Sequence, residues 1–131
     1  MTPLLWIVVK MAVVTLVTLL VASLLRARGW TPAGMQLAMG NREHMPDPSA
    51  LAGRTDRAAR NGLESFVLFA ALALVAHGAA ATSPLVLQGA QWFFWSRLVY
   101  IVVYLVGIPY LRTGVWGVGV AGLGLMIAGL G

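Results

Sequence analysis

The residues best suited to chemistry lie in the stretch DRAARNGLESF, residues 56 to 66, where a polar segment runs into an apolar one. Four of its side chains recur at i, i+3, i+4 and i+7, which places them on one face of a helix: Arg57, Arg60, Asn61 and Glu64. Guanidinium groups bind carboxylates in a bidentate manner. The stripe therefore predicts a site for an anion-rich small molecule, with one carboxylate for an ammonium or another donor.

Other ionisable and phenolic side chains interrupt apolar runs elsewhere in the chain. They are a lysine in the first run, an arginine and two tyrosines at i, i+3 and i+7 in the third, and an arginine-threonine pair at the fourth: Lys10, Arg97, Tyr100, Tyr104, Arg112 and Thr113. A lone charge in hydrocarbon costs about 2.5–3.5 kcal/mol even on the most lenient scale. We therefore expect these groups to face a shared polar pocket.

Structural roles explain the same residues without a ligand. The arginines at the start of the stripe could anchor a helix end by extending toward lipid headgroups. Asn61 and Glu64 could connect helices by pairing with Arg97 or Lys10, and the tyrosines could be packing or interfacial aromatics. The spacing of the residues is compatible with a ligand site and also with contacts that hold the helices together.

The segments that position these groups are long and apolar. The chain has 131 residues, of which 60% are hydrophobic and 10% charged. About 20 apolar residues cross the roughly 30 Å of a bilayer's hydrocarbon. We predict one all-α membrane domain over residues 1–131, a four-helix bundle with a long first loop at about 26–60 and helices at about 3–25, 61–81, 85–108 and 113–130.

The arginines between the apolar segments indicate how the chain is oriented. The long loop contains Arg26, Arg28, Arg42, Arg54, Arg57 and Arg60, and the third loop contains Arg112. Positively charged loops stay on the cytoplasmic side. We predict an integral multi-pass protein with the first and third loops in the cytoplasm and both termini outside. The long loop should contain a short interfacial turn or helix that covers a site, or else be a plain connector.

Composition excludes several classes of function. Cysteine is absent, which rules out disulfides and thiolate sites, and no metal site is predicted because His44 and His77 lie far apart. The net charge of +5 lies beside membrane spans and does not indicate nucleic acid. A transporter or channel is disfavoured because the charges gather at one end of the predicted spans.

Three stretches together resemble the MAPEG family, the membrane-associated proteins in eicosanoid and glutathione metabolism. They are VVKMAVV (residues 8 to 14), DRAARNGLESF (56 to 66) and FFWSRLVYIVVYLVGIPYLRTGVW (93 to 116). The second is similar to the arginine-asparagine-glutamate signature at the start of the family's second helix. The third has an arginine followed by a small hydroxyl residue, Arg112–Thr113, although Trp116 stands where some members have tyrosine.

This resemblance implies a homotrimer of four-helix bundles that binds glutathione between subunits near the cytoplasmic face. Glu64 would then meet the γ-glutamyl end of glutathione, and Arg60 and Asn61 would fix its polar groups. Arg112 would stabilise the thiolate, with Thr113 donating a hydrogen bond. The remaining candidates, Lys10, Arg57, Arg97, Tyr100 and Tyr104, would line or support the site.

The resemblance also implies a reaction class. A glutathione transferase or peroxidase of the bacterial branch, in the bacterial inner membrane, would act on hydrophobic electrophiles or lipid hydroperoxides that enter from the membrane lipids. The alternative is a non-catalytic binding or scaffold protein of the same fold, in which the polar stripe serves helix packing and trimer assembly.

Overall fold

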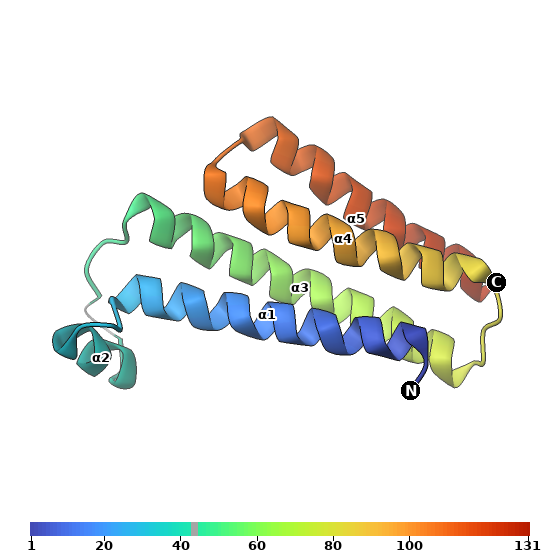
Figure 1. The fold of residues 1–131 in the computed structure, drawn as a ribbon, viewed down its shortest axis with the longest axis horizontal. Helices are drawn as coiled ribbons and strands as arrows, with labels where there is room; N and C mark the ends of the chain where they lie inside the picture. The colour runs from blue at the N-terminus through green and yellow to red at the C-terminus, as the bar shows by residue number, and fades with distance from the viewer. Residues whose placement is uncertain (43–44) are drawn as a thin grey trace.

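The computed structural model of the protein describes residues 1–42 and 45–131, and this described part is helical. Its helices are α1 (Pro3–Ala27), α2 (Pro32–Met39), α3 (Ala50–Gly78), α4 (Pro84–Val106) and α5 (Pro109–Leu130). Figure 1 shows α1 beside α3, α4 beside α5, and the short α2 beyond the end of α1. His44 lies outside the described residues.

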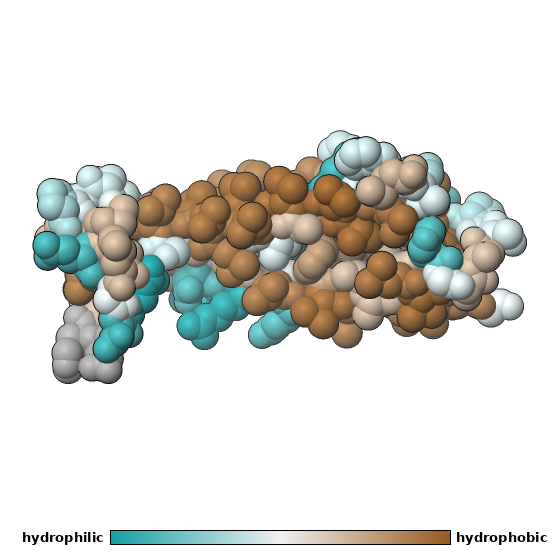
Figure 2. All heavy atoms as spheres, turned by 90° about the horizontal axis from the view of Figure 1, so that it is seen from below, coloured by the Kyte–Doolittle hydropathy of each residue, from teal (hydrophilic) through white to brown (hydrophobic). Residues whose placement is uncertain are grey.

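Four of these helices are long and apolar enough to cross a membrane: α1, α3, α4 and α5. This confirms the predicted all-α fold with four spans and indicates a multi-pass integral membrane protein. Figure 2 shows the apolar surface as a band along the molecule, with hydrophilic atoms at its two ends and along part of one edge. α2 is the short helix predicted within the first loop.

Local sequence sets the ends of the helices. The hydroxyl of Thr2 accepts a hydrogen bond from the amide of Leu5, and that of Ser83 accepts one from Leu85, in each case with proline at the first helical position. α4 ends at Val106 and is capped by Gly107, whose φ of 91° lies in the left-handed region that favours glycine. The short turn at this glycine makes α4 and α5 antiparallel neighbours.

The second span begins earlier than its apolar pattern predicts. α3 starts at Ala50 instead of near Asn61, and the Ser49 hydroxyl caps it by accepting from the amide of Ala52 at 3.1 Å. Its first turns are polar, so an apolar pattern cannot detect them, but alanine and arginine there have high intrinsic helix propensity. Because α3 starts early, the arginine stripe lies on a regular helix and not in a loop.

The fourth span also starts earlier than predicted. α5 begins at Pro109 instead of near Thr113, so Arg112 and Thr113 belong to its first turns. Proline is well tolerated at the first helical position because its missing amide is not needed there. The helix therefore fixes the direction of both side chains.

The core lies between the four long helices and is filled by aromatic and thioether side chains. Phe69 of α3 and Phe93 of α4 stack with ring centroids 4.6 Å apart, and both are almost fully buried. Met11 and Met126 extend this core into α1 and α5. Stacking across the core joins the α1–α3 pair to the α4–α5 pair and sets the depth of the polar residues beside it.

Close backbone contact holds α5 against α4. A Cβ atom added at Gly122 would lie 2.6 Å from the carbonyl oxygen of Gly89, and one added at Gly119 would lie 2.8 Å from the Ser96 hydroxyl. Gly114, Gly117 and Gly124 have open space instead. Only some of the glycines of α5 therefore pack closely against α4.

The two connections that were predicted to carry arginine lie at the same end of the bundle, although Arg112 itself belongs to α5. In Figure 1 the chain between α1 and α3 and the turn between α4 and α5 are at one end, and both termini are at the other. The arrangement follows from four consecutive antiparallel spans. It brings the polar ends of α3, α4 and α5 together.

Candidate functional site

A polar cavity of about 320 Å³ opens between α3, α4 and α5 at the arginine-bearing end of the bundle. It is lined by Arg57, Asn61, Tyr100, Tyr104, Arg112, Thr113 and Trp116. Six of these seven residues are sequence-predicted site residues, contributed by three helices that are separate in sequence. None of the described lining residues is acidic, so the cavity is suited to an anion.

Tyr104 lies between two arginines of this cavity. Arg57 Nε donates a hydrogen bond to Tyr104 Oη at 2.9 Å, and the Arg112 guanidinium lies 4.8 Å from the centroid of the same ring. A phenol can accept and donate at once, so accepting from Arg57 leaves the hydroxyl proton for another acceptor. Tyr104 thus holds one cation in place, carries a second on its ring, and keeps a donor for a ligand.

Behind the cavity, Arg97 orients Asn61. Arg97 is only 3% exposed; its Nη1 donates to Asn61 Oδ1 at 2.7 Å, and its guanidinium lies 4.2 Å from the centroid of the Tyr100 ring. Because an arginine can only donate, the oxygen of the Asn61 amide must face it. The Asn61 Nδ2 group is therefore left as a donor on a residue that lines the cavity.

Among the described residues, no acidic side chain matches the charge of Arg97. Its Nη2 is buried and makes no hydrogen bond, and no described carboxylate oxygen lies within 4.0 Å of the guanidinium. A buried cation without a paired anion is unfavourable, and its field extends into the neighbouring space. The cavity is therefore positive both from its lining and from the residue behind it.

Arg112 and Thr113 approach the cavity from the start of α5. Arg112 is partly buried against Tyr104, whereas Thr113 is exposed and its Oγ1 donates to the Pro109 carbonyl oxygen at 3.3 Å. The start of α5 has no side-chain cap. Its free amides and the helix dipole add positive potential at the cavity.

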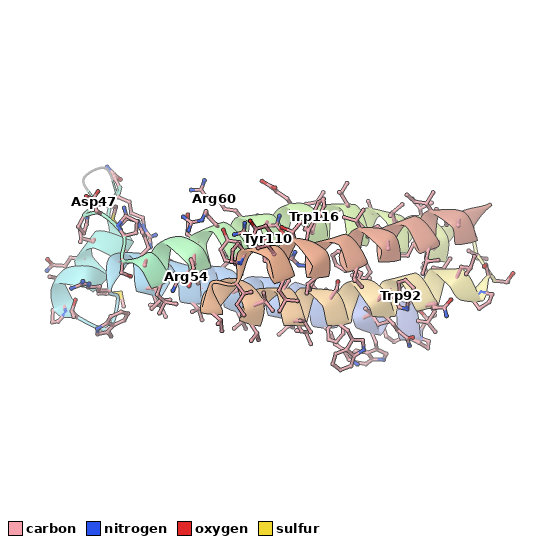
Figure 3. All side chains as sticks on the ribbon, turned by 90° about the horizontal axis from the view of Figure 1, so that it is seen from above. Asp47, Arg54, Arg60, Trp92, Tyr110 and Trp116 are labelled. Carbon is pink, nitrogen blue, oxygen red and sulfur yellow. The ribbon has the colours of Figure 1, made fainter. Side chains whose placement is uncertain are left out.

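Two residues of the predicted stripe do not line the cavity. Arg60 pairs with Asp56 at 3.3 Å and points away from the bundle in Figure 3, with a side chain 76% exposed, and Glu64 is also exposed. At about 100° per residue, the four residues cover an arc of about 100°, with Arg57 and Asn61 at one edge. Only that edge meets α4, so the other edge faces outward.

Lys10 also lies outside the cavity. It is exposed, and it lines a separate hollow with Gln91 toward the N-terminal ends of α1 and α4. These ends belong to the opposite side of the bundle, because α1 and α4 run toward the arginine-bearing connections (Figure 1). The sequence pattern could not reveal this, since a lysine inside an apolar run carries no information about depth relative to other helices.

One contributor to the site was not singled out by the sequence pattern. Arg54 Nε donates to the carbonyl oxygen of Leu105 at 3.2 Å, and its side chain lies beside Gly107. A cation at a helix C-terminus satisfies carbonyls that have no partner within the helix. Arg54 therefore fastens the end of α4 to α3, and its i, i+3 spacing before Arg57 was the available signal.

The combination of four spans with arginine, asparagine and tyrosine side chains meeting at one end can be compared with known families. The sequence model of the MAPEG family matches residues 3–131, almost the whole chain. The protein belongs to the MAPEG family. This family includes glutathione transferases and peroxidases as well as other members. Searches of curated proteins and of solved structures found no match to this MAPEG protein.

Proposed function

We propose that this MAPEG protein is a membrane-embedded, glutathione-dependent transferase or peroxidase. The observation that carries the proposal is the convergence of Arg57, Arg112 and the Tyr104 hydroxyl on a cavity whose described lining contains no carboxylate. Glutathione has two carboxylates for the cations and a thiol that reacts as its anion. Family membership supports glutathione as the anion that this cavity receives.

In this proposal Arg112 is the catalytic cation. A guanidinium beside the bound thiol lowers the pKa of that thiol and raises the fraction present as nucleophilic thiolate. The Tyr104 hydroxyl is the neighbouring donor for the sulfur anion, and the Thr113 hydroxyl becomes a second donor by turning from the Pro109 carbonyl oxygen to the sulfur. The thiolate then attacks an electrophilic carbon to form a carbon–sulfur bond, and the leaving group takes the electron pair.

With a hydroperoxide the same thiolate attacks oxygen instead. The oxygen–oxygen bond breaks, glutathione becomes a sulfenic acid, and the hydroperoxide leaves as an alcohol after taking a proton. A second glutathione reduces the sulfenic acid and releases water, giving glutathione disulfide. A hydrophobic substrate for either reaction reaches the cavity from the surrounding lipid.

The remaining cavity residues hold the tripeptide. Arg57 is suited to a carboxylate, and Asn61 Nδ2 is a donor for a carbonyl or carboxylate oxygen. Arg97 and Tyr100 position these groups from behind. Because ligand pockets usually measure about 300–1,000 Å³, a cavity of about 320 Å³ is at the small end for a tripeptide.

A neighbouring subunit would enlarge this site. We propose the homotrimer that the family resemblance implies, with the outward edge of the stripe, Arg60 and Glu64, facing a neighbour. Glutathione would then lie between subunits and meet Glu64 with its ammonium group. The excess of arginine in the connections supports a cytoplasmic location of this end, and a bacterial inner membrane is the location we propose.

A scaffold role for the polar groups is the second candidate, and the hydrogen bond from the buried Arg97 to Asn61 favours it. In that case Arg97→Met and Glu64→Gln should lower the thermal stability of the assembly in detergent equally with and without glutathione. Normal assembly and stability of both variants would count against the scaffold role.

The test of the proposed function is a glutathione titration of detergent-solubilised protein, followed by the ultraviolet absorbance of the thiolate and by melting temperature. We expect a saturable thiolate signal that disappears in Arg112→Met and persists in Arg28→Met, a matched loss of one cation outside the cavity. Binding without a thiolate signal in the unaltered protein would indicate a carrier. A signal unchanged in Arg112→Met would overturn the assignment of Arg112.

A further inference from the structure

Lys10 and Gln91 share a second hollow, of about 520 Å³, at the end of the bundle opposite to the arginine-bearing connections. Each lies seven residues after the first residue of its helix, Pro3 in α1 and Pro84 in α4. Both helices begin at the same end (Figure 1), so a rise of about 1.5 Å per residue places both side chains at a depth of about 10 Å. An ammonium and an amide thus lie at one level of the spanning region.

The charge of Lys10 has no counterpart among the described residues of this hollow. The other lining residues are apolar in their side chains: Met1, Pro3, Trp6, Ile7 and Leu87. A lysine within a membrane span is unfavourable unless an anion or the lipid interface stabilises its charge. Since the described lining contains no carboxylate, an anion that stabilises Lys10 here has to come from outside this hollow.

An apolar groove adjoins the hollow at Gln91. It has a volume of about 610 Å³ and runs along α4 and α5, lined by Gln91, Trp92, Trp95, Ser96, Val99, Val115 and Val118. From Gln91 to Val99 the helix rises about 12 Å. In Figure 3, Trp92 lies toward the end of the bundle away from Arg60 and Tyr110. The cationic hollow and the apolar groove therefore meet at Gln91, which lines both.

We propose that these two hollows bind one acidic phospholipid. Its phosphodiester accepts hydrogen bonds from Lys10 Nζ and Gln91 Nε2, and one acyl chain lies along the groove past Val99. Phosphate is the anion that a bilayer presents at its interface, and Trp6 is of the residue type enriched at that level. A zwitterionic headgroup would bring its own cation beside Lys10, so charge complementarity favours an acidic lipid.

The site is independent of glutathione, and native mass spectrometry of the full chain in detergent tests it. The protein is delipidated, incubated with phosphatidylglycerol or phosphatidylcholine, and examined for retained lipid. We expect retention of phosphatidylglycerol to exceed that of phosphatidylcholine. Lys10→Met and Gln91→Leu should each weaken it about tenfold, as expected for loss of a hydrogen bond to a charged group. Arg28→Met is the matched charge control and should bind as the unaltered chain does.

Two further variants test the lipid-binding proposal if Lys10→Met does not fold. Lys10→Arg keeps the charge and should keep the lipid, whereas Val99→Trp fills the groove and should lose it with Lys10 intact. Equal retention by Lys10→Met and the unaltered chain would overturn the proposal. So would equal loss in Arg28→Met, or displacement of the lipid by inorganic phosphate, which would indicate a site for free anions only.

Discussion

Arg97 fixes the orientation of Asn61, because its Nη1 donates to Asn61 Oδ1 at 2.7 Å from a position that is almost fully buried. The pair has both of the roles that the sequence left open, the connection of helices and the binding of a ligand. The hydrogen bond connects α3 to α4, which is a structural role, and it leaves the Asn61 amide nitrogen as a donor at the cavity, which is a binding role. Substitutions at Asn61 can separate the two.

Asn61→Asp should keep the structural role and lose the binding role. The carboxylate accepts from Arg97 and adds the missing counter-charge, so we expect a melting temperature in detergent equal to or above that of the unaltered protein. It also replaces a donor at the cavity with an acceptor and adds negative charge, so glutathione should bind at least about tenfold more weakly, as for loss of one charge-assisted hydrogen bond. Calorimetric titration measures the second effect.

Asn61→Leu is the matched variant for that pair. It leaves the buried Arg97 guanidinium without its acceptor, which should cost about 1–3 kcal/mol of stability. A thermal melt in detergent measures this loss. If Asn61→Asp were destabilised as much as Asn61→Leu, the hydrogen bond to Arg97 would not be the feature that matters at this position.

Tyr104→Phe should weaken thiolate formation while leaving the fold intact. The ring under Arg112 remains, but the hydroxyl that accepts from Arg57 and donates to the ligand is lost. A hydrogen bond to a charged group contributes about 1.5–3 kcal/mol, so glutathione thiolate should form roughly ten- to a hundredfold less readily. Thiolate absorbance measures this, and Tyr110→Phe, at a tyrosine that is 91% exposed, is the control. An undiminished signal in Tyr104→Phe would remove Tyr104 from the site.

The number of spans and most of the cavity residues could be predicted from the sequence, because apolar length and one-face spacing are local properties. Arg57 and Asn61 line the cavity as expected. What could not be predicted was which edge of the stripe meets another helix, because Arg60 and Glu64 satisfy the same spacing yet face outward. The depth of Lys10 depends on helix direction and register, which no single segment encodes.

Gly122→Ala should destabilise the α4–α5 pair, whereas Gly124→Ala should not. The new Cβ at Gly122 would lie 2.6 Å from the Gly89 carbonyl oxygen, a backbone atom that can move little, but at Gly124 nothing lies within 4 Å. Overpacking costs about 1–3 kcal/mol, and alanine in an open helical position gains about 0.5–1 kcal/mol over glycine. Thermal melts in detergent compare the two. A stable Gly122→Ala would mean that α5 can slide on α4.

Arg54→Met should loosen the turn that carries Arg112 into the site. Arg54 Nε donates to the Leu105 carbonyl oxygen, and the amides of Gly107 and Ile108 both bond to the Val103 carbonyl at the same helix end. Removing the cation from this end should cost about 1–3 kcal/mol and speed the exchange of these two amides with solvent. Hydrogen exchange by mass spectrometry measures the turn directly.

Arg42→Met is the control for this last effect, because Arg42 connects the chain after α2 to α1: among the described residues its side chain donates hydrogen bonds to the Ser23 hydroxyl and the Ala38 carbonyl oxygen, and not to the α4–α5 turn. It should leave the exchange of the Gly107 and Ile108 amides unchanged. If Arg54→Met also left them unchanged, the turn would be held by Gly107 and Pro109 alone, since a left-handed glycine and a fixed proline φ restrict the backbone without help from α3. Faster exchange in Arg54→Met alone would show that α3 positions the start of α5, and with it the cation proposed to stabilise the thiolate.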